Sequence, residues 1–246
     1  MPRIRNIYEP GASKPYRLSR SRLENFLRCP RCFYLDRRLG IDVPSGPPFS
    51  LNIAVDALLK KEFDLYRIRQ EPHPYMVDAN IDAVPAIHEQ LDEWRENFKG
   101  IRHLHEKTNL EIQGAIDDLW INEAGEHIVV DYKATAKSEP VTELNDTWHG
   151  SYKRQMEVYQ WLLRKSGLKV SDTGYFVYCT GRPDADAFDA KLEFDIHLIP
   201  YVGKDDWVEG KILEIHKVLE GGDVPDGDKD CDYCRYRAAV GGLKRP

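Results

Sequence analysis

The sequence predicts a mixed α/β fold, because two kinds of hydrophobic pattern alternate along it. Apolar residues recur at helical spacing over residues 51–69 and 148–166, whereas short segments rich in β-branched and aromatic residues lie between and after these helices. With 246 residues, 41% of them apolar, the chain can bury a full core. We expect one domain over residues 1–246, with a basic, cysteine-containing cap formed by residues 1–50 and 222–246.

The individual elements follow from start and stop signals. Ser21 and Glu24 form a capping box, and Pro85 suits the first turn of a helix. A proline-rich loop is expected at residues 43–48. The predicted helices are 21–28, 51–69, 85–100, 148–166 and 206–221. The predicted strands are 101–106, 108–121 with a bend at Gly114, 127–133, 175–179 and 192–198.

The charge is unevenly distributed along the chain. The net charge is -6, yet residues 1–38 contain ten Lys or Arg against three Asp or Glu. A basic arm beside an acidic site suits a polyanionic substrate, and the ordinary alternative is a solvated tail. No stretch approaches the ~20 apolar residues of a membrane span, and the first residues lack the apolar centre of a signal peptide. We therefore expect a cytoplasmic protein.

Two acidic residues mark the ends of predicted strands. Asp117 follows the bend at Gly114, and Asp131 ends the apolar run 128–130. Residues i and i+2 of a strand share a face, ~6.6 Å apart, so Asp131 and Lys133 can address one bound group. Alone, an acid near a turn usually accepts from turn amides, and an acid beside a lysine is often a surface ion pair. Together, on adjacent strands, they predict a metal-dependent phosphodiesterase site.

The helix predicted at 148–166 adds Gln155 and Tyr159, which are four residues apart and share one helix face. An amphipathic helix can carry such a pair by chance. This helix directly follows strand 127–133, however, so it can pack across the strand. That packing would bring the Gln155 amide toward the phosphate or the attacking water.

These motifs resemble those of the PD-(D/E)XK nuclease superfamily, and within it the RecB-like branch that includes the CRISPR-adaptation nucleases. Residues 114–117, 131–133 and 155–159 are similar to the branch's GxxD, (D/E)xK and QxxxY motifs. The resemblance extends to residues 29–35 and to the terminal cysteine pair. It implies a restriction-endonuclease-like core of helix, β-meander, helix and strand, with helical additions and a Cys-rich cap that joins the two termini.

The resemblance also implies an activity, the hydrolysis of DNA phosphodiester bonds with Mg²⁺ or Mn²⁺. Asp117 and Asp131 would ligate the cation, with the Tyr132 carbonyl as a third oxygen, a ligand set that suits a hard ion. Lys133 would stabilise charge at the phosphate or help to deprotonate the attacking water. Gln155 would orient that water or the substrate.

One position departs from the branch, which often carries Gly-x-x-x-His on a helix before the meander, with the histidine as an extra ligand. This chain has residues 52–56 there, ending in Asp56. We expect Asp56 to substitute as an oxygen ligand, against the ordinary alternative of a solvated helix residue. Glu111 is a weaker candidate for the same role. Tyr159 is expected to pack against the site and buttress it.

Four of the five cysteines form two CxxC pairs, Cys29 with Cys32 and Cys231 with Cys234. Four thiolates are enough to close a tetrahedral metal site or to hold a cluster. A local zinc ribbon has its pairs about 15–20 residues apart, whereas a site shared by these distant pairs would tie the chain's ends together. Paired CxxC motifs seldom serve as disulfides in a reducing compartment. Cys179 lies in an apolar strand and is expected to be a core residue.

The resemblance favours a [4Fe-4S] cluster at these four cysteines. The branch often uses one amino-terminal and three carboxy-terminal cysteines, so a two-plus-two arrangement departs from its pattern. The spacing suits structural Zn²⁺ equally, and a site without metal is the third possibility.

The sequence thus predicts a Mg²⁺- or Mn²⁺-dependent deoxyribonuclease that acts on single-stranded DNA or duplex ends. The alternative is a catalytically silent nucleic-acid-binding or partner-docking module on the same fold. Such a module is expected to lose Asp117, Asp131 or Lys133, and all three are present. Hydrolysis of RNA or another phosphodiester is a third possibility. Relatives act in DNA repair and in defence, so protein partners in such processes are expected.

Overall fold

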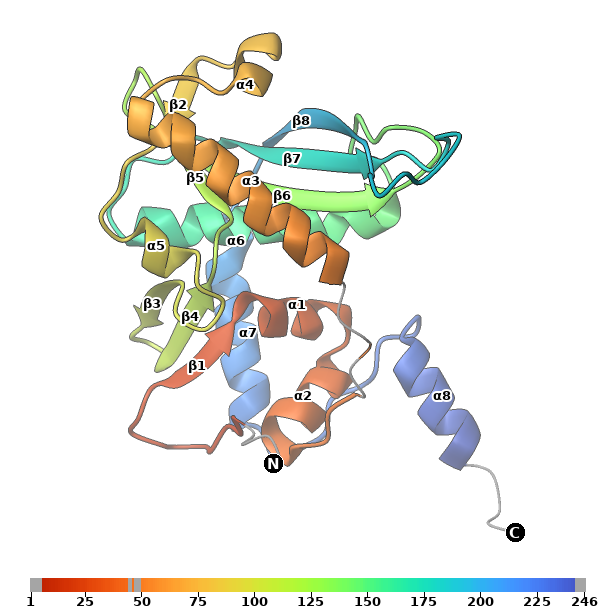
Figure 1. The fold of residues 1–246 in the computed structure, drawn as a ribbon. Coiled ribbons are helices and arrows are strands. Elements are labelled where there is room, and N and C mark those ends of the chain that lie inside the picture. The colour runs from red at the N-terminus through yellow and green to blue at the C-terminus, as the bar shows by residue number, and fades with distance from the viewer. Residues whose placement is uncertain (1–5, 44–45, 47–49, 242–246) are drawn as a thin grey trace. The chain divides into compact units, whose positions relative to one another are not determined.

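The computed structural model describes residues 6–43, 46 and 50–241, and its contacts divide the chain into two compact units. Both units combine segments that are distant in the sequence (Figure 1). Most of the loop predicted at 43–48 lies outside the described residues. The single domain with a cap of residues 1–50 and 222–246 stays a prediction. Unit 1 is drawn from residues 1–47, 103–113 and 206–246, and unit 2 from residues 48–102 and 114–205.

Helices and strands alternate along the chain, as the mixed α/β prediction requires. The helices are α1 Arg20–Arg28, α2 Pro30–Leu39, α3 Ser50–Arg69, α4 Pro74–Asp78, α5 Leu91–Trp94, the 3₁₀ turn η1 Thr147–His149, α6 Gly150–Lys165, α7 Trp207–Glu220 and α8 Asp232–Gly241. The strands are β1 Tyr16–Ser19, β2 Ala83–Pro85, β3 Ile101–His105, β4 Leu110–Gly114, β5 Asp118–Asn122, β6 His127–Ala136, β7 Thr173–Gly181 and β8 Phe194–Val202. None of the helices in the described part of the chain is long and apolar enough to span a membrane.

Unit 2 is built around a five-stranded sheet with the strand order β2-β5-β6-β7-β8. Strands β6 and β7 run parallel, and the other neighbouring pairs are antiparallel. A parallel pair needs a long crossover connection, which α6 provides. The central strand β6 is buried from residue 128 to residue 132, where the sheet is covered on both faces.

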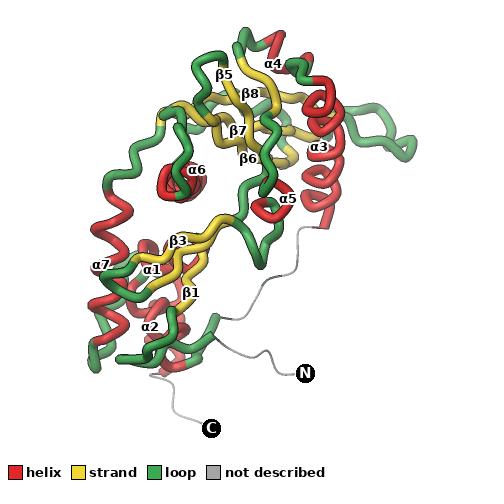
Figure 2. Tube along the Cα trace, turned by 90° about the vertical axis from the view of Figure 1, so that its left-hand side faces the viewer, coloured by secondary structure: helices red, strands yellow, loops and turns green. Residues whose placement is uncertain are grey.

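Helices α3 and α6 lie on opposite sides of this sheet (Figure 2). Val130 and Tyr132 of β6 join the core cluster on the α3 side, together with Phe63 of α3 and Trp120 of β5. The residue between them, Asp131, points to α6 instead, since successive side chains of a strand alternate between its faces. The alternation thus places the side chains of Val130 and Tyr132 in the core cluster and the carboxylate of Asp131 on the α6 face.

Unit 1 holds most of a three-stranded sheet with the order β1-β4-β3, in which β1 runs parallel to β4. Helices α1, α2 and α7 pack on one another, and the rings of Phe26 and Phe33 meet edge to face at 5.3 Å. The buried face of α7 has apolar residues at helical spacing. Its members are Val208, Ile212, Ile215 and Leu219.

The prediction of a helix at residues 85–100 was wrong. Pro85 ends strand β2, which pairs with β5 at the edge of the sheet, and only α5 is helical in this region. Proline is favoured in the first turn of a helix, but it is also tolerated in an edge strand, because its missing N–H then leaves no ladder bond unmade. The sequence signal was therefore ambiguous.

Two further differences concern the strands and the cysteine motifs. The strand predicted at 108–121 is interrupted between β4 and β5, which belong to different sheets, and the strand predicted at 101–106 lies beside β4 rather than β5. The sequence analysis also missed β1, β2, α2, α4 and α8. Helices α2 and α8 each begin one residue after the first cysteine of a CxxC pair.

Candidate functional site

The register of β5 and β6 brings the two predicted aspartates together. Asp118 pairs with Val130 in this antiparallel ladder, so the next step along it brings Asp117 opposite Asp131. Asp117 precedes the first residue of β5, and its Oδ2 accepts a hydrogen bond of 2.8 Å from the backbone N–H of Tyr132. The Asp117 carboxylate therefore lies against the main chain of the Asp-x-Lys segment.

Asp131 is fully buried and is held by partners from β6 and α6. Its carboxylate forms an ion pair with the ammonium group of Lys133. Gln155 donates a hydrogen bond from Nε2 to Asp131 Oδ1 at 2.7 Å, and the same amide nitrogen lies 3.0 Å from the hydroxyl of Tyr159. The structure thus brings the Gln155 and Tyr159 pair into contact with Asp131, as the packing of α6 across β6 predicted.

Tyr159 packs so closely against position 114 that only glycine fits there. A Cβ atom at position 114 would lie 2.7 Å from Cε1 of Tyr159 and 3.0 Å from Cδ1 of Leu162. Real Cβ atoms essentially never approach other atoms so closely. The glycine of this motif therefore makes room for the Tyr159 and Leu162 side chains of α6.

Lys133 is the charged centre of the α6 face. Its Nζ lies 3.4 Å from the carbonyl oxygen of Tyr132 and 4.7 Å from the centre of the Tyr152 ring. Burial acts to lower the pKa of Lys133, but the carboxylates of Asp131 and Asp117 raise it more, so the pKa lies above its ordinary value. The side chain is therefore a cation at neutral pH.

Helix α3 contributes Asp56 and, one turn later, Lys60, which the sequence analysis did not select. Lys60 Nζ lies 2.8 Å from Asp56 Oδ2 and 3.6 Å from Asp117 Oδ1. Burial and the nearby Asp117 carboxylate raise the pKa of Asp56, although Lys60 and Lys133 oppose this. Asp56 therefore belongs to the same charged group as Asp117. The i, i+4 spacing of an acid and a lysine was the available sequence signal.

The sequence analysis also missed Asp118, whose role is structural, unlike that of its neighbour Asp117. It is fully buried and accepts hydrogen bonds from Arg67, from Arg95 at 2.6 Å and from the Tyr132 hydroxyl at 2.8 Å. Its own strand adds the Leu119 N–H at 2.8 Å. Asp118 is thus neutralised by two guanidinium groups and anchors β5 and β6 from the α3 side.

The donor atoms of the site fit a hard divalent cation. Asp117 and Asp131 offer carboxylate oxygens, and Tyr132 offers a main-chain carbonyl, which are the ligands that Mg²⁺ and Mn²⁺ prefer. Among the described residues, however, no three acidic or histidine side chains bring their ligand atoms within 4.8 Å of one another. In this structure the carboxylates pair with ammonium groups instead: Lys60 contacts Asp56 and Asp117, and Lys133 contacts Asp131.

The charge balance of the site favours a cation. The carboxylates of Asp56, Asp117 and Asp131 exceed the ammonium groups of Lys60 and Lys133 by one negative charge. The raised pKa of Asp56 reflects, after its burial, the repulsion from Asp117. A divalent ion at Asp117 would have to displace or repel the Lys60 ammonium.

The remaining acidic candidate, Glu111, has another partner. It lies on β4 and forms an ion pair of 2.7 Å with Arg17 of β1. Both residues belong to unit 1, whereas the acids and lysines described above belong to unit 2. Among the described residues, Glu111 belongs to no cluster of three or more possible metal ligands.

The four paired cysteines come together in unit 1. The Sγ atoms of Cys29 and Cys234 are 3.6 Å apart, as are those of Cys32 and Cys231. All four sulfurs lie within 4.8 Å of one another, which makes them a possible metal site. Cys179, by contrast, is a buried member of the core cluster of unit 2, and its burial raises the pKa of the thiol to about 12.

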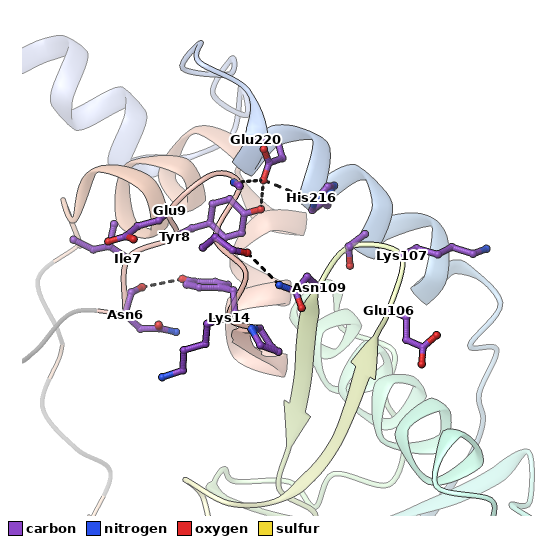
Figure 3. A pocket seen from close by; sticks show the side chains of 15 residues that line it. Asn6, Ile7, Tyr8, Glu9, Lys14, Glu106, Lys107, Asn109, His216 and Glu220 are labelled. Atoms are coloured by element: carbon purple, nitrogen blue, oxygen red, sulfur yellow. Dashed lines mark hydrogen bonds and ion pairs between the residues drawn. The ribbon is translucent and has the colours of Figure 1, made fainter.

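Unit 1 also contains a polar cavity of about 400 Å³ (Figure 3). The Tyr8 hydroxyl donates a hydrogen bond to Glu220 of α7 at its wall, and His216 lies one turn earlier on the same helix. Both acidic and basic side chains line the cavity, among them Glu9, Lys14, Glu106 and Lys107. It shares no residue with the predicted nuclease motifs.

Comparison with known proteins identifies the family. A family model of the PD-(D/E)XK nuclease superfamily matches residues 17–239. No curated protein matches the chain. Among solved structures, the crystal structure of SSO0001 resembles it with a TM-score of 0.43 and 17% identity, over 92% of this chain and 86% of that one.

The family match includes all three motifs of the acidic site and both CxxC pairs. It also spans most of the chain, from β1 into α8. Members of this family are usually nucleases that use divalent metal ions. The chain therefore belongs to the PD-(D/E)XK nuclease superfamily.

Proposed function

We propose that this protein is a metal-dependent nuclease that hydrolyses DNA phosphodiester bonds at the Asp117, Asp131 and Lys133 site. The observation that carries the proposal is the hydrogen bond from the Tyr132 N–H to Asp117, which joins the two acidic segments. A buried carboxylate and a charged lysine lie directly beside this contact. The site is thus assembled from segments that the family motifs predict.

Each side chain has a distinct task in this proposal. Asp117, Asp131 and the Tyr132 carbonyl hold the cation. The bound Mg²⁺ or Mn²⁺ would supply polarisation of the attacking water and of the phosphate. Lys133 stabilises the negative charge that develops on the phosphate or helps to deprotonate the attacking water.

Gln155 and Tyr159 are positioning residues. Gln155 holds the buried Asp131 carboxylate through its amide N–H groups, and the Tyr159 hydroxyl lies beside the same amide. Asp56 is the proposed additional oxygen ligand from α3. Its carboxylate reaches Asp117 through the shared ammonium of Lys60.

The alternative function is a catalytically silent DNA-binding or partner-docking module. The intact constellation of Asp117, Asp131 and Lys133 favours the enzyme. Burial alone does not separate the two functions, since Asp118 is equally buried as a structural anchor.

A cleavage assay separates these functions. Labelled single-stranded DNA, blunt duplex DNA, supercoiled plasmid and RNA would be incubated with Mg²⁺, with Mn²⁺ or with a chelator. We expect cation-dependent cleavage of DNA, and a loss of about 100-fold or more in Lys133→Met. Lys169→Met, an exposed lysine of unit 2, is the matched control.

The outcomes are distinct. Binding of DNA by a folded protein without cleavage under any cation supports the silent module. Cleavage that persists undiminished in Lys133→Met assigns the activity to a different site. Preferential cleavage of RNA contradicts the proposed substrate.

A further inference from the structure

The four sulfurs of the CxxC pairs converge on one small space. Cys29 to Cys234 and Cys32 to Cys231 measure 3.6 Å between Sγ atoms, and Cys32 to Cys234 measures 3.7 Å. The other pairs among the four are within 4.8 Å. Each motif thus contacts the other, and neither closes a site by itself.

These distances match a single tetrahedral ion. With a Zn–S bond of about 2.3 Å, ideal tetrahedral geometry places neighbouring sulfurs about 3.8 Å apart. A cubane cluster has a separate iron atom for each cysteine and therefore needs its four thiolates farther apart. The sulfur positions fit a single tetrahedral ion and leave no room between them for a cubane cluster.

The two motifs present their sulfurs in the same way. The carbonyl of Cys29 accepts the first helical hydrogen bond of α2, from Phe33, and the carbonyl of Cys231 accepts the corresponding bond of α8, from Arg235. In each motif the first cysteine therefore caps a helix and the second lies in its first turn. Helix amino termini stabilise negative charge, which four thiolates around one divalent ion retain.

The loop before α8 closes over the sulfurs. The Asp228 N–H points to Cys29 Sγ at 3.4 Å. A Cβ atom on Gly227 would lie only 2.9 Å from Cys234 Sγ, so the backbone approaches this sulfur directly. Main-chain N–H groups that point at sulfur and a closely wrapped loop are what a closed structural site requires.

We propose that Cys29, Cys32, Cys231 and Cys234 bind one structural Zn²⁺, and that the [4Fe-4S] cluster suggested by resemblance does not fit this chain. The ion cross-links the beginning of α2 to the beginning of α8. Its binding free energy contributes to the folding of unit 1, because the site does not exist in the unfolded chain. The inference rests on the cysteine geometry and is independent of the proposed nuclease activity.

Metal analysis of the full-length protein, purified without a chelator, tests the proposal. We expect one zinc per chain, no acid-labile sulfide and no visible absorption band. Protein reconstituted with Co²⁺ is expected to show the visible bands of a tetrahedral thiolate complex. Iron, with or without sulfide, overturns the proposal, and so does a metal-free protein with four freely titratable thiols.

Cysteine variants locate the ion. Cys234→Ser is expected to lose most of the zinc, whereas Cys179→Ser, in the core of unit 2, is the matched control and keeps it. Because Cys234→Ser can impair folding, the metal content and spectrum of the unmodified protein remain the primary readout. Full zinc occupancy in a folded Cys234→Ser protein contradicts the assigned ligands.

Discussion

Asp117 accepts a hydrogen bond of 2.8 Å from the backbone N–H of Tyr132, and this contact joins the end of one motif to the middle of the next. The bond uses Oδ2, while Oδ1 faces the Lys60 ammonium at 3.6 Å. The carboxylate therefore has both a structural and an electrostatic contact. Substitutions can separate the two.

Asp117→Asn tests the electrostatic contact. Asparagine keeps a carbonyl oxygen that can accept from Tyr132, so the melting temperature is expected to change little. The lost negative charge weakens cation binding, and kcat is expected to fall by about 100-fold or more. Steady-state cleavage kinetics with a thermal melt check both parts. A folded Asp117→Asn protein with full activity would show that Asp117 is not part of the catalytic site.

Asp118→Asn is expected to lower the stability of the fold and to change kcat little, the opposite of Asp117→Asn. The change leaves the guanidinium groups of Arg67 and Arg95 without their shared buried counter-charge. Breaking a buried ion pair on one side costs about 3–5 kcal/mol, and the loss here is expected to be smaller because the partly exposed Asp64 still pairs with both arginines. Urea unfolding measures this loss, and Asp117→Asn is its neighbour control. Equal stability of the two variants would contradict the structural role assigned to Asp118 and the catalytic role assigned to Asp117.

Lys60→Met is expected to strengthen cation binding. The ammonium group lies beside both Asp56 and Asp117, so it repels a divalent ion at the same carboxylates. Removal of one like charge at this distance near a protein surface is expected to tighten the Mn²⁺ affinity on the order of tenfold. Calorimetric titration measures it, with the exposed Lys61→Met as control. Weaker Mn²⁺ binding in Lys60→Met would show that Lys60 supports the ion.

Gly114→Ala is expected to damage both stability and activity. The new methyl group would overlap the Tyr159 ring and displace the side chain that contacts Gln155. Overpacking of this kind costs about 1–3 kcal/mol. Gly210→Ala in α7, where a Cβ meets nothing within 4 Å, is the control and is expected to stabilise the helix slightly. Unchanged activity in Gly114→Ala would mean that Tyr159 does not position the site.

His73 is expected to make unit 2 less stable in acid. Burial lowers the pKa of His73 below its ordinary value, although Glu62 opposes this. The unfolded chain therefore takes up a proton near pH 6.5, before the folded chain does. Stability present above this pH is lost as the pH falls toward the folded-state pKa.

Urea midpoints between about pH 8 and pH 5, in the protein and in His73→Asn, check this expectation. Asparagine can replace the acceptor that caps α4 through the Tyr75 N–H, but it does not titrate. The variant is expected to show a weaker pH dependence. An identical slope in both proteins assigns the acid sensitivity to other groups.

The sequence predicted the parts of the site that depend on local periodicity. Asp131 and Lys133 share a face because strand side chains alternate, and Gln155 reaches Asp131 because α6 crosses directly over β6. The mixed α/β fold was predicted correctly for the same reason, whereas the family was predicted from the resemblance of three short motifs. Long, regular elements carry a strong pattern.

Tertiary contacts account for what the sequence did not predict. Asp117 and Asp118 are adjacent and chemically identical, and only the strand end and the arginines Arg67 of α3 and Arg95 after α5 give them different roles. Lys60 enters the site through the packing of α3. The helices α2 and α8 are short and polar, so their cysteines were visible but their helical starts were not.

Direct titration of Mn²⁺ tests the central claim, that the carboxylates of Asp117 and Asp131 bind one divalent ion. Electron paramagnetic resonance of free Mn²⁺ would be followed in the unmodified protein, in Asp117→Asn, in Asp131→Asn and in the exposed control Asp172→Asn. We expect the same binding site to be lost in both of the first two variants and kept in the control. Undiminished Mn²⁺ binding in a folded Asp131→Asn protein would contradict the claim.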